Sequence, residues 1–324
     1  MWSVLDWLLE RCRTRSQRIR ALGGDPDLGT VGRYVKLRLL SQGDTSLVYV
    51  AAPADSLRRE HLVALKILLL PKSTSSSLEW DQRQNQLRDF FREIHLLRKL
   101  NHPNLVRLVE VVEDVHVPFL AREYIDGQTL TQRMKARPGQ LSEAEFRPLA
   151  KTLLEALAYA HENRVVHRGL QPDNVMMTAD GVLKVTNFGL ARPVDFHGRL
   201  VYGSPGYIPP EILSGSPGKP DPTHDQYAIG LILFELLAGR PANPGRDISE
   251  KLFCGLEHDL LDLRELRPDL GGLCDWVQRL MAREAFRRFP SLEVALEELS
   301  ESTASLTPPA APLKGGPSGP ERNG

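Results

Sequence analysis

Hydrophobic and polar positions follow different patterns in the two parts of this 324-residue chain. Between Arg33 and Ala51, two short apolar runs flank a polar turn at residues 41–46, and this pattern predicts a strand hairpin. Two further short apolar runs, His61–Leu70 and Phe119–Ala121, predict additional strands. We therefore expect a small sheet in the first part of the chain.

Longer apolar patterns with helical spacing follow the predicted hairpin. One helix is predicted over roughly Gln84–Leu100, and another follows Ser142, which can cap its N-terminus with Glu145 as the capping-box partner. A strand pair is predicted to turn at Asp180-Gly181, and a strongly apolar helix is predicted to begin at Asp225. We therefore expect the second part of the chain to be mainly helical.

The two ends of the chain differ from its centre. Residues 1–22 place apolar side chains at helical spacing and carry five arginines between Arg11 and Arg20, before Gly23-Gly24 ends the helix. We expect a leader helix that packs on the domain or stays loose; the alternative is an interfacial helix that binds a membrane or a partner. Residues 301–324 are rich in Pro, Gly, Ser and Ala, which predicts a disordered tail or a linker.

Composition narrows the class of protein and of partner. Lys plus Arg (41) balances Asp plus Glu (41), so net charge favours neither nucleic acid nor an anionic membrane as a partner. The three cysteines, Cys12, Cys254 and Cys274, form no CxxC pair, which argues against a disulfide framework and a structural zinc site. No run of about 18 apolar residues is present. These features predict a cytoplasmic globular protein.

The most specific segment is Val165–Met176, with the sequence VVHRGLQPDNVM. It resembles the catalytic loop HRDLKPxN of the eukaryotic-type protein kinases, and the loop proline favours the serine/threonine branch. Further motifs of that family recur in the family's order: VALK ending at Lys66, HPNLVRL ending at Leu108, and GSPGYIPPE ending at Glu211. The resemblance covers roughly Arg33–Ser300.

This resemblance implies an α+β, bilobal protein-kinase-like fold. A small antiparallel-sheet N-lobe with one main helix is expected at residues 33–123, and a mainly helical C-lobe at residues 128–300. Residues 1–32 would then precede the domain and residues 301–324 would follow it. In the C-lobe, Arg288 is expected to pair with Glu211. Leu97, Leu108, His167 and Phe188 are expected to form a spine through both lobes.

The family's nucleotide cleft is implied at Gly43, Val48, Ala64, Lys66, Glu93 and Met176. Lys66 stands where the family's lysine contacts the α- and β-phosphates, and Glu93 where a glutamate pairs with that lysine. The glycine-rich loop is degenerate: Ser41 and Ser46 replace the two outer glycines, and Asp44 adds a negative charge.

A second departure lies at the back of this cleft. Arg122 occupies the gatekeeper position of the adenine pocket, which is normally uncharged in the family. Burying an unpaired ion is costly, and Glu93 is the carboxylate best placed to pair with Arg122. The alternatives are a side chain that turns outward to solvent and an alignment shifted by one residue.

The catalytic positions themselves are altered. The catalytic Asp of the family is Gly169 here, the following Lys is Gln171, and the magnesium-binding Asp of DFG is Asn187, while Asn174 is retained. No intact catalytic set remains, and Asn174 and Asn187 are the only candidate metal ligands. Asp173, the one carboxylate that could substitute in this loop, is expected to point elsewhere.

Two functions follow from this pattern. The first is a pseudokinase, a kinase-fold scaffold or allosteric regulator that binds a protein partner and has no cofactor. The alternative is a weak or unconventional serine/threonine kinase that uses ATP and Mg²⁺ through Lys66, Glu93, Asn174 and Asn187. Nucleotide binding distinguishes the two.

Overall fold

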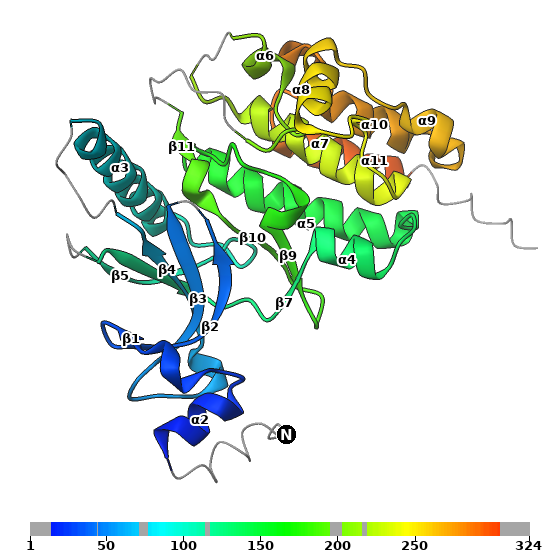
Figure 1. Ribbon diagram of the computed structural model, residues 1–324. Helices are drawn as coiled ribbons and strands as arrows, with labels where there is room; N and C mark the ends of the chain where they lie inside the picture. Colours follow the sequence, from blue (N-terminus) through cyan, green and yellow to red (C-terminus); the bar gives the residue numbers. More distant parts are fainter. Residues whose placement is uncertain are drawn as a thin grey trace, which may run out of the picture.

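The computed structural model describes residues 14–43, 45–70, 77–113, 117–194, 203–215 and 219–304. It has two lobes, a sheet with one long helix and a larger helical part (Figure 1). The predicted α+β bilobal architecture is confirmed. Asp44, the basic N-terminal segment up to residue 13 and the tail from residue 305 lie outside the described residues.

The N-lobe is built on a six-stranded antiparallel sheet with the strand order β1-β2-β3-β4-β6-β5. The predicted hairpin turn is shorter than expected, because β2 continues to Gln42 and β3 begins at Ser46. The strands are β1 (Thr30–Val31), β2 (Tyr34–Gln42), β3 (Ser46–Pro53), β4 (Val63–Leu68), β5 (Leu108–Val112) and β6 (Phe119–Glu123).

Helix α3 (Ser77–Lys99) is the one long helix of the N-lobe. It buries Phe90 and Ile94 against Leu68 and Leu120 of the sheet. The helix begins seven residues before the predicted start at Gln84, so that boundary was wrong. Its first two turns are mostly polar, with Leu78 and Trp80 as the apolar residues, but Glu, Gln and Arg are good helix formers and favour the longer helix.

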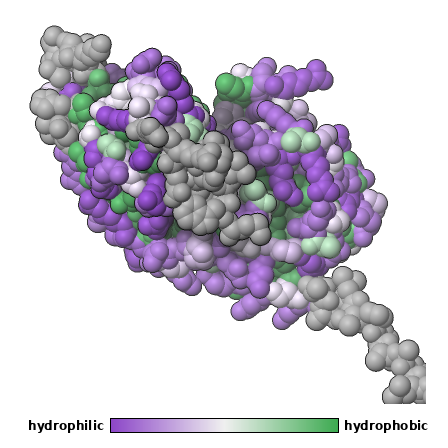
Figure 2. Space-filling model, turned by 90° about the horizontal axis from the view of Figure 1, so that it is seen from below, coloured by the Kyte–Doolittle hydropathy of each residue, from purple (hydrophilic) through white to green (hydrophobic). Residues whose placement is uncertain are grey.

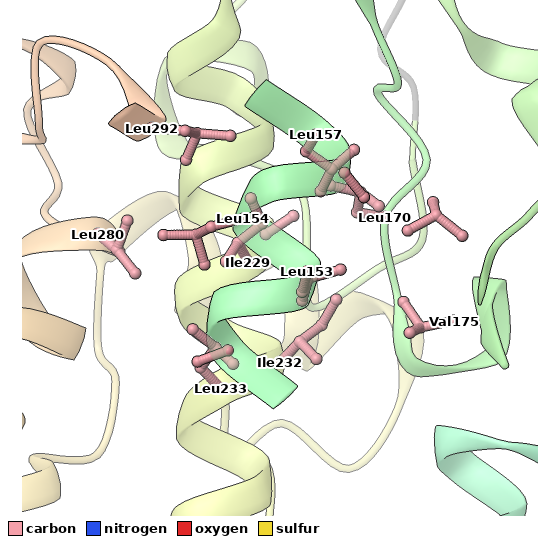
Figure 3. Close-up of a cluster of buried hydrophobic side chains, with 14 of the residues drawn as sticks. Leu153, Leu154, Leu157, Leu170, Val175, Ile229, Ile232, Leu233, Leu280 and Leu292 are labelled. Carbon is pink, nitrogen blue, oxygen red and sulfur yellow. The ribbon is translucent and has the colours of Figure 1, made fainter. Parts of the chain in front are cut away.

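The C-lobe encloses the largest hydrophobic cluster. Leu153, Leu154 and Leu157 of α5 pack against Ile229 and Leu233 of α7, as Figure 3 shows. The helices are α4 (Leu130–Ala136), α5 (Glu143–Glu162), α6 (Pro210–Leu213), α7 (Pro222–Ala238), α8 (Ile248–Glu257), α9 (Leu263–Leu266), α10 (Gly272–Leu280) and α11 (Leu292–Ala304). The short strands are β7 (Gly127–Thr129), β8 (Val165–Val166), β9 (Val175–Thr178), β10 (Leu183–Val185) and β11 (Arg192–Pro193).

Local signals placed several C-lobe boundaries correctly. Ser142 and Glu145 form the predicted capping box of α5. The predicted turn between β9 and β10 contains Gly181, whose positive φ of 85° favours glycine. The prediction that α7 begins at Asp225 was wrong, because Asp221 caps the helix one turn earlier and Asp225 lies inside it, buried.

Described residues before the expected domain start at residue 33 pack on the N-lobe sheet. Helix α2 (Arg15–Ala21) buries Ile19 in a cluster with Val35, Leu37 and Val50 of the sheet. Of the two forms of leader helix considered, packed and loose, the packed form is present for α2. In Figure 1, α2 lies at the end of the N-lobe remote from the C-lobe.

Within the described residues, none of the helices has the length and apolar character needed to cross a membrane. The face shown in Figure 2 is mostly hydrophilic, with small and separate hydrophobic patches.

Candidate functional site

A cleft of about 630 Å³ is lined by residues from both lobes. Its volume lies within the range of ordinary small-molecule sites. Five of the six predicted cleft residues line it, together with Arg122 and the two candidate metal ligands Asn174 and Asn187: Gly43, Val48, Ala64, Lys66 and Met176. Glu93 lies behind this wall on α3, with only 2% of its side chain exposed. The residues predicted for a nucleotide cleft therefore converge on one site, whereas Gly169 and Gln171 are not among the residues that line it.

Glu93 joins two cations of the cleft. Lys66 Nζ donates a 2.6 Å hydrogen bond to Glu93 Oε2, so the predicted ion pair is present. Arg122 Nη1 lies 3.7 Å from the other carboxylate oxygen, Oε1. Burial alone would raise the pKa of Glu93, but Lys66 and Arg122 outweigh burial and hold the pKa below its ordinary value. The carboxylate therefore stays charged and ties α3 to the sheet.

Arg122 points inward, and the alternative of a solvent-directed side chain is wrong. It lies on β6 opposite Ala64 of β4, and its side chain is only 11% exposed. Its Nε and Nη1 are buried without a hydrogen-bond partner, since 3.7 Å to Glu93 exceeds hydrogen-bond distance. A cation with incomplete hydrogen bonding therefore forms part of the cleft wall.

A buried carboxylate, Asp225, holds the backbone of the loop that contains His167 and Arg168. Asp225 accepts hydrogen bonds of 2.8 Å from the backbone N–H groups of His167 and Arg168 and pairs with His161 at 2.8 Å. Burial would raise the pKa of Asp225, but these contacts, led by the hydrogen bond to His161, lower it. Arg168 adopts a left-handed conformation, with φ of 63°. These hydrogen bonds therefore hold the loop backbone in place, although position 169 is a glycine.

Gly169 has an apolar neighbour where a side chain would project. A Cβ built on Gly169 would lie 3.3 Å from Leu190 Cδ1 and 3.6 Å from Leu190 Cβ. Leu190 belongs to the short helical turn Phe188–Leu190 that follows Asn187. A carboxylate at position 169 would therefore require Leu190 to move by a few tenths of an ångström.

The two candidate metal ligands bind each other. Asn187 Nδ2 donates to Asn174 Oδ1 at 3.1 Å, and Asn174 Nδ2 donates to the Gly169 carbonyl at 2.6 Å. Mg²⁺ prefers oxygen ligands, with carboxylates among them, and here an amide hydrogen bond uses the oxygen of Asn174. Across the described residues, no group of three or more His, Cys, Asp or Glu side chains is arranged to hold a metal. The residues present do not fit a magnesium ion.

Asp173 and Gln171 are the other loop residues singled out in the sequence. Asp173 lines the cleft, but its Oδ1 lies 3.5 Å from Thr129 Oγ1 at the start of α4. It is therefore directed towards α4, as expected from the sequence. Gln171 precedes the short helical turn Pro172–Asn174 and caps it without a side-chain hydrogen bond.

Two buried aromatic side chains continue the predicted spine. The rings of His167 and Phe188 pack edge to face with centroids 4.6 Å apart. Gly169 N–H donates to His167 Nδ1, and His167 Nε2 donates to the Thr186 carbonyl, so the ring is neutral. Burial lowers the pKa of His167 accordingly. Leu97 is buried and Leu108 packs half-buried against the same core.

The segment after Asn187 is tied to both lobes. Arg192 Nη2 bonds Asp89 Oδ1 of α3 at 3.0 Å, and burial lowers the pKa of Arg192 to about 10. At the far end, Arg288 donates two hydrogen bonds to Glu211, at 2.7 and 2.9 Å, as predicted.

Three contacts around the site were not found from the sequence: Arg192 with Asp89, Arg38 with the Tyr124 hydroxyl at 2.7 Å, and Leu190 beside Gly169. No local motif signals them, because the partners meet only in the folded chain.

Comparison with known proteins agrees with this geometry. The protein kinase domain matches residues 34–269. The serine/threonine-protein kinase PrkC of Bacillus subtilis (strain 168) is 29% identical over 267 residues, which are 81% of this chain and 39% of that protein. Cyclin-dependent kinase 17 of Caenorhabditis elegans is 34% identical over 249 residues, 75% of this chain and 35% of that protein. The matches span less than half the length of either relative.

Proposed function

Because the chain belongs to the protein kinase family, we propose that it is a pseudokinase, a kinase-fold scaffold or allosteric regulator that acts through contacts with a protein partner. The observation that carries this proposal is Gly169. It stands in the catalytic loop where the family has its base, and Leu190 lies against it. Loss of a general base typically slows a reaction by about 10²–10⁴-fold.

Two further features support the same proposal. The two candidate metal ligands, Asn187 and Asn174, are uncharged and hydrogen-bonded to each other, and Gln171 stands where the family has a lysine. Catalysis in this family depends almost entirely on positioning and electrostatic stabilisation. Defects in the base, the metal and the cation should therefore multiply.

The retained features support a binding role. The chain keeps the buried pairs that shape both lobes, Lys66 with Glu93 and Glu211 with Arg288. A protein that only needs to present a kinase-shaped surface requires these pairs, but it does not require Gly169 or Asn187 to be carboxylates.

A weak ATP-dependent serine/threonine kinase is the second candidate. The cleft of about 630 Å³ and the 2.6 Å contact between Lys66 and Glu93 favour it, because active kinases require that pair. Gly169 and Asn187 argue against it.

The test is the thermal stability of the purified protein with millimolar ATP and Mg²⁺. We expect no shift in melting temperature and no autophosphorylation with labelled ATP. A ligand at 100 times its Kd would add about 2.7 kcal/mol to the free energy of unfolding, which is readily measured. A clear shift with phosphate incorporation would overturn the proposal in favour of the weak kinase.

A further inference from the structure

Three cations line the cleft among the described residues, and they differ in how well they are paired. Lys66 has a 2.6 Å hydrogen bond to Glu93. Arg38 of β2 donates to the hydroxyl of Tyr124, the residue after β6, at 2.7 Å. Arg122 has only the 3.7 Å contact with Glu93 and two buried nitrogens without hydrogen bonds. Arg122 is therefore the least well paired of the three cations, and its side chain is part of the cleft wall.

The chemistry of a guanidinium restricts what that ligand can be. All five N–H groups of an arginine are donors, and it has no acceptor. Any ligand atom that meets Arg122 should therefore accept a hydrogen bond, and a charge-assisted bond there is stronger than a neutral one. An exocyclic amino group in the same place would put donor against donor.

The rest of the cleft suits a flat ring. Val48 and Ala64 line it from β3 and β4, and Met176 lines it from β9 in the other lobe. Apolar walls with a few polar groups are typical of small-molecule sites. The phosphate end lacks a fitting metal site, as the bond between Asn187 and Asn174 indicates. Recognition should therefore depend on the ring more than on phosphates.

We infer that Arg122 makes this cleft selective for a 6-oxopurine nucleoside over a 6-aminopurine nucleoside. Arginine pairs with the O6 and N7 acceptors of guanine, whereas adenine carries a donor in place of O6. Arg122 therefore disfavours the amino group of the ATP purine and favours a purine with a carbonyl facing Arg122. This inference rests on the proposed function, because it takes ATP not to be the natural ligand.

The experiment compares inosine with adenosine, which carry an oxo and an amino group, respectively, at C6. Both are titrated calorimetrically into the full chain without phosphate or Mg²⁺. Wild type should bind inosine about 5- to 150-fold more tightly, since a correct base contact to arginine discriminates by about one to three kcal/mol. Arg122→Met should lose this preference. Arg122→Gln, whose amide can pair with the amino group and N7 of adenine, should shift the preference towards adenosine.

Arg38→Met is the matched control, because it removes another cation that lines the same cleft. It should keep the preference for inosine. Equal binding of both nucleosides by wild type, binding of neither, or a preference for inosine that survives in Arg122→Met would overturn the inference. Binding of neither leaves the proposed function standing, whereas tight binding of adenosine with an ATP-dependent shift in melting temperature would overturn both.

Discussion

At the residue scale, the charges that are buried and paired are retained, whereas two positions that are carboxylates in active kinases are uncharged here. Glu93, Asp225 and Arg288 are each at least 98% buried, and each is held by opposite charges or hydrogen bonds. Gly169 and Asn187, by contrast, stand at positions that are carboxylates in active kinases. Removing a buried partner leaves an uncompensated ion, whereas removing a charge beside a cleft has no such cost. Stability alone therefore accounts for the retained set.

The first prediction at this scale concerns Arg288. Its side chain is fully buried, and it donates to Glu211 and to three backbone carbonyls. Arg288→Ala should lower the free energy of unfolding by about 3–5 kcal/mol, because Glu211 would lose its partner. Urea denaturation followed by circular dichroism measures the change.

The neighbouring Arg287 provides the control. Its side chain is 68% exposed and lies 3.5 Å from Glu284, and exposed pairs contribute at most about 1 kcal/mol. Equal stability of Arg288→Ala and Arg287→Ala would show that the pair with Glu211 does not stabilise the C-lobe.

A contact between two residues could be predicted from the sequence when both residues belong to recognisable motifs. Lys66 with Glu93 and Glu211 with Arg288 were predictable because each residue belongs to a recognisable segment. Arg192 with Asp89 was not, since an arginine and an aspartate 103 positions apart carry no local signal. Packing of the segment after Asn187 on α3 creates that contact.

At the element scale, the strands and buried helices were predictable from periodicity, and the exposed helical turns were not. The first two turns of α3 are mostly polar, and their two apolar residues, Leu78 and Trp80, are too few to mark the helix start at Ser77. Helix α2 is short and basic, and Ile19 is its one buried residue. One apolar side chain in a polar helix does not reveal which surface it will contact.

The prediction at this scale is that α2 stabilises the N-lobe through Ile19. This side chain is 3% exposed and contacts the cluster of Val35, Leu37 and Val50. Ile19→Ala should reduce the free energy of unfolding by about 2–5 kcal/mol, the usual range for this truncation in a core. The exposed Arg20→Ala in the same helix should change it by less than about 0.5 kcal/mol. Indistinguishable denaturation curves for the two variants would mean that α2 does not pack on the sheet in solution.

At the scale of the whole molecule, the cleft forms between the two lobes, which are held together by direct contacts. Lys184 of the C-lobe bonds Glu123 of β6 at 2.8 and 3.0 Å, and Val106 N–H donates to the Val185 carbonyl at 2.9 Å. These contacts set the cleft walls independently of the residues at positions 169 and 187. Restoring catalytic side chains therefore leaves these contacts between the lobes, and Arg122 in the cleft wall, in place.

The final prediction follows from that separation. Gly169→Asp with Asn187→Asp restores the base and the metal ligand, but both act on an ATP that must first bind beside Arg122. We expect this double variant to remain inactive in an autophosphorylation assay with labelled ATP. Adding Arg122→Met and Ser46→Gly should restore nucleotide binding first and slow phosphoryl transfer second. Strong activity of the double variant alone would mean that Arg122, although inward, does not limit nucleotide binding.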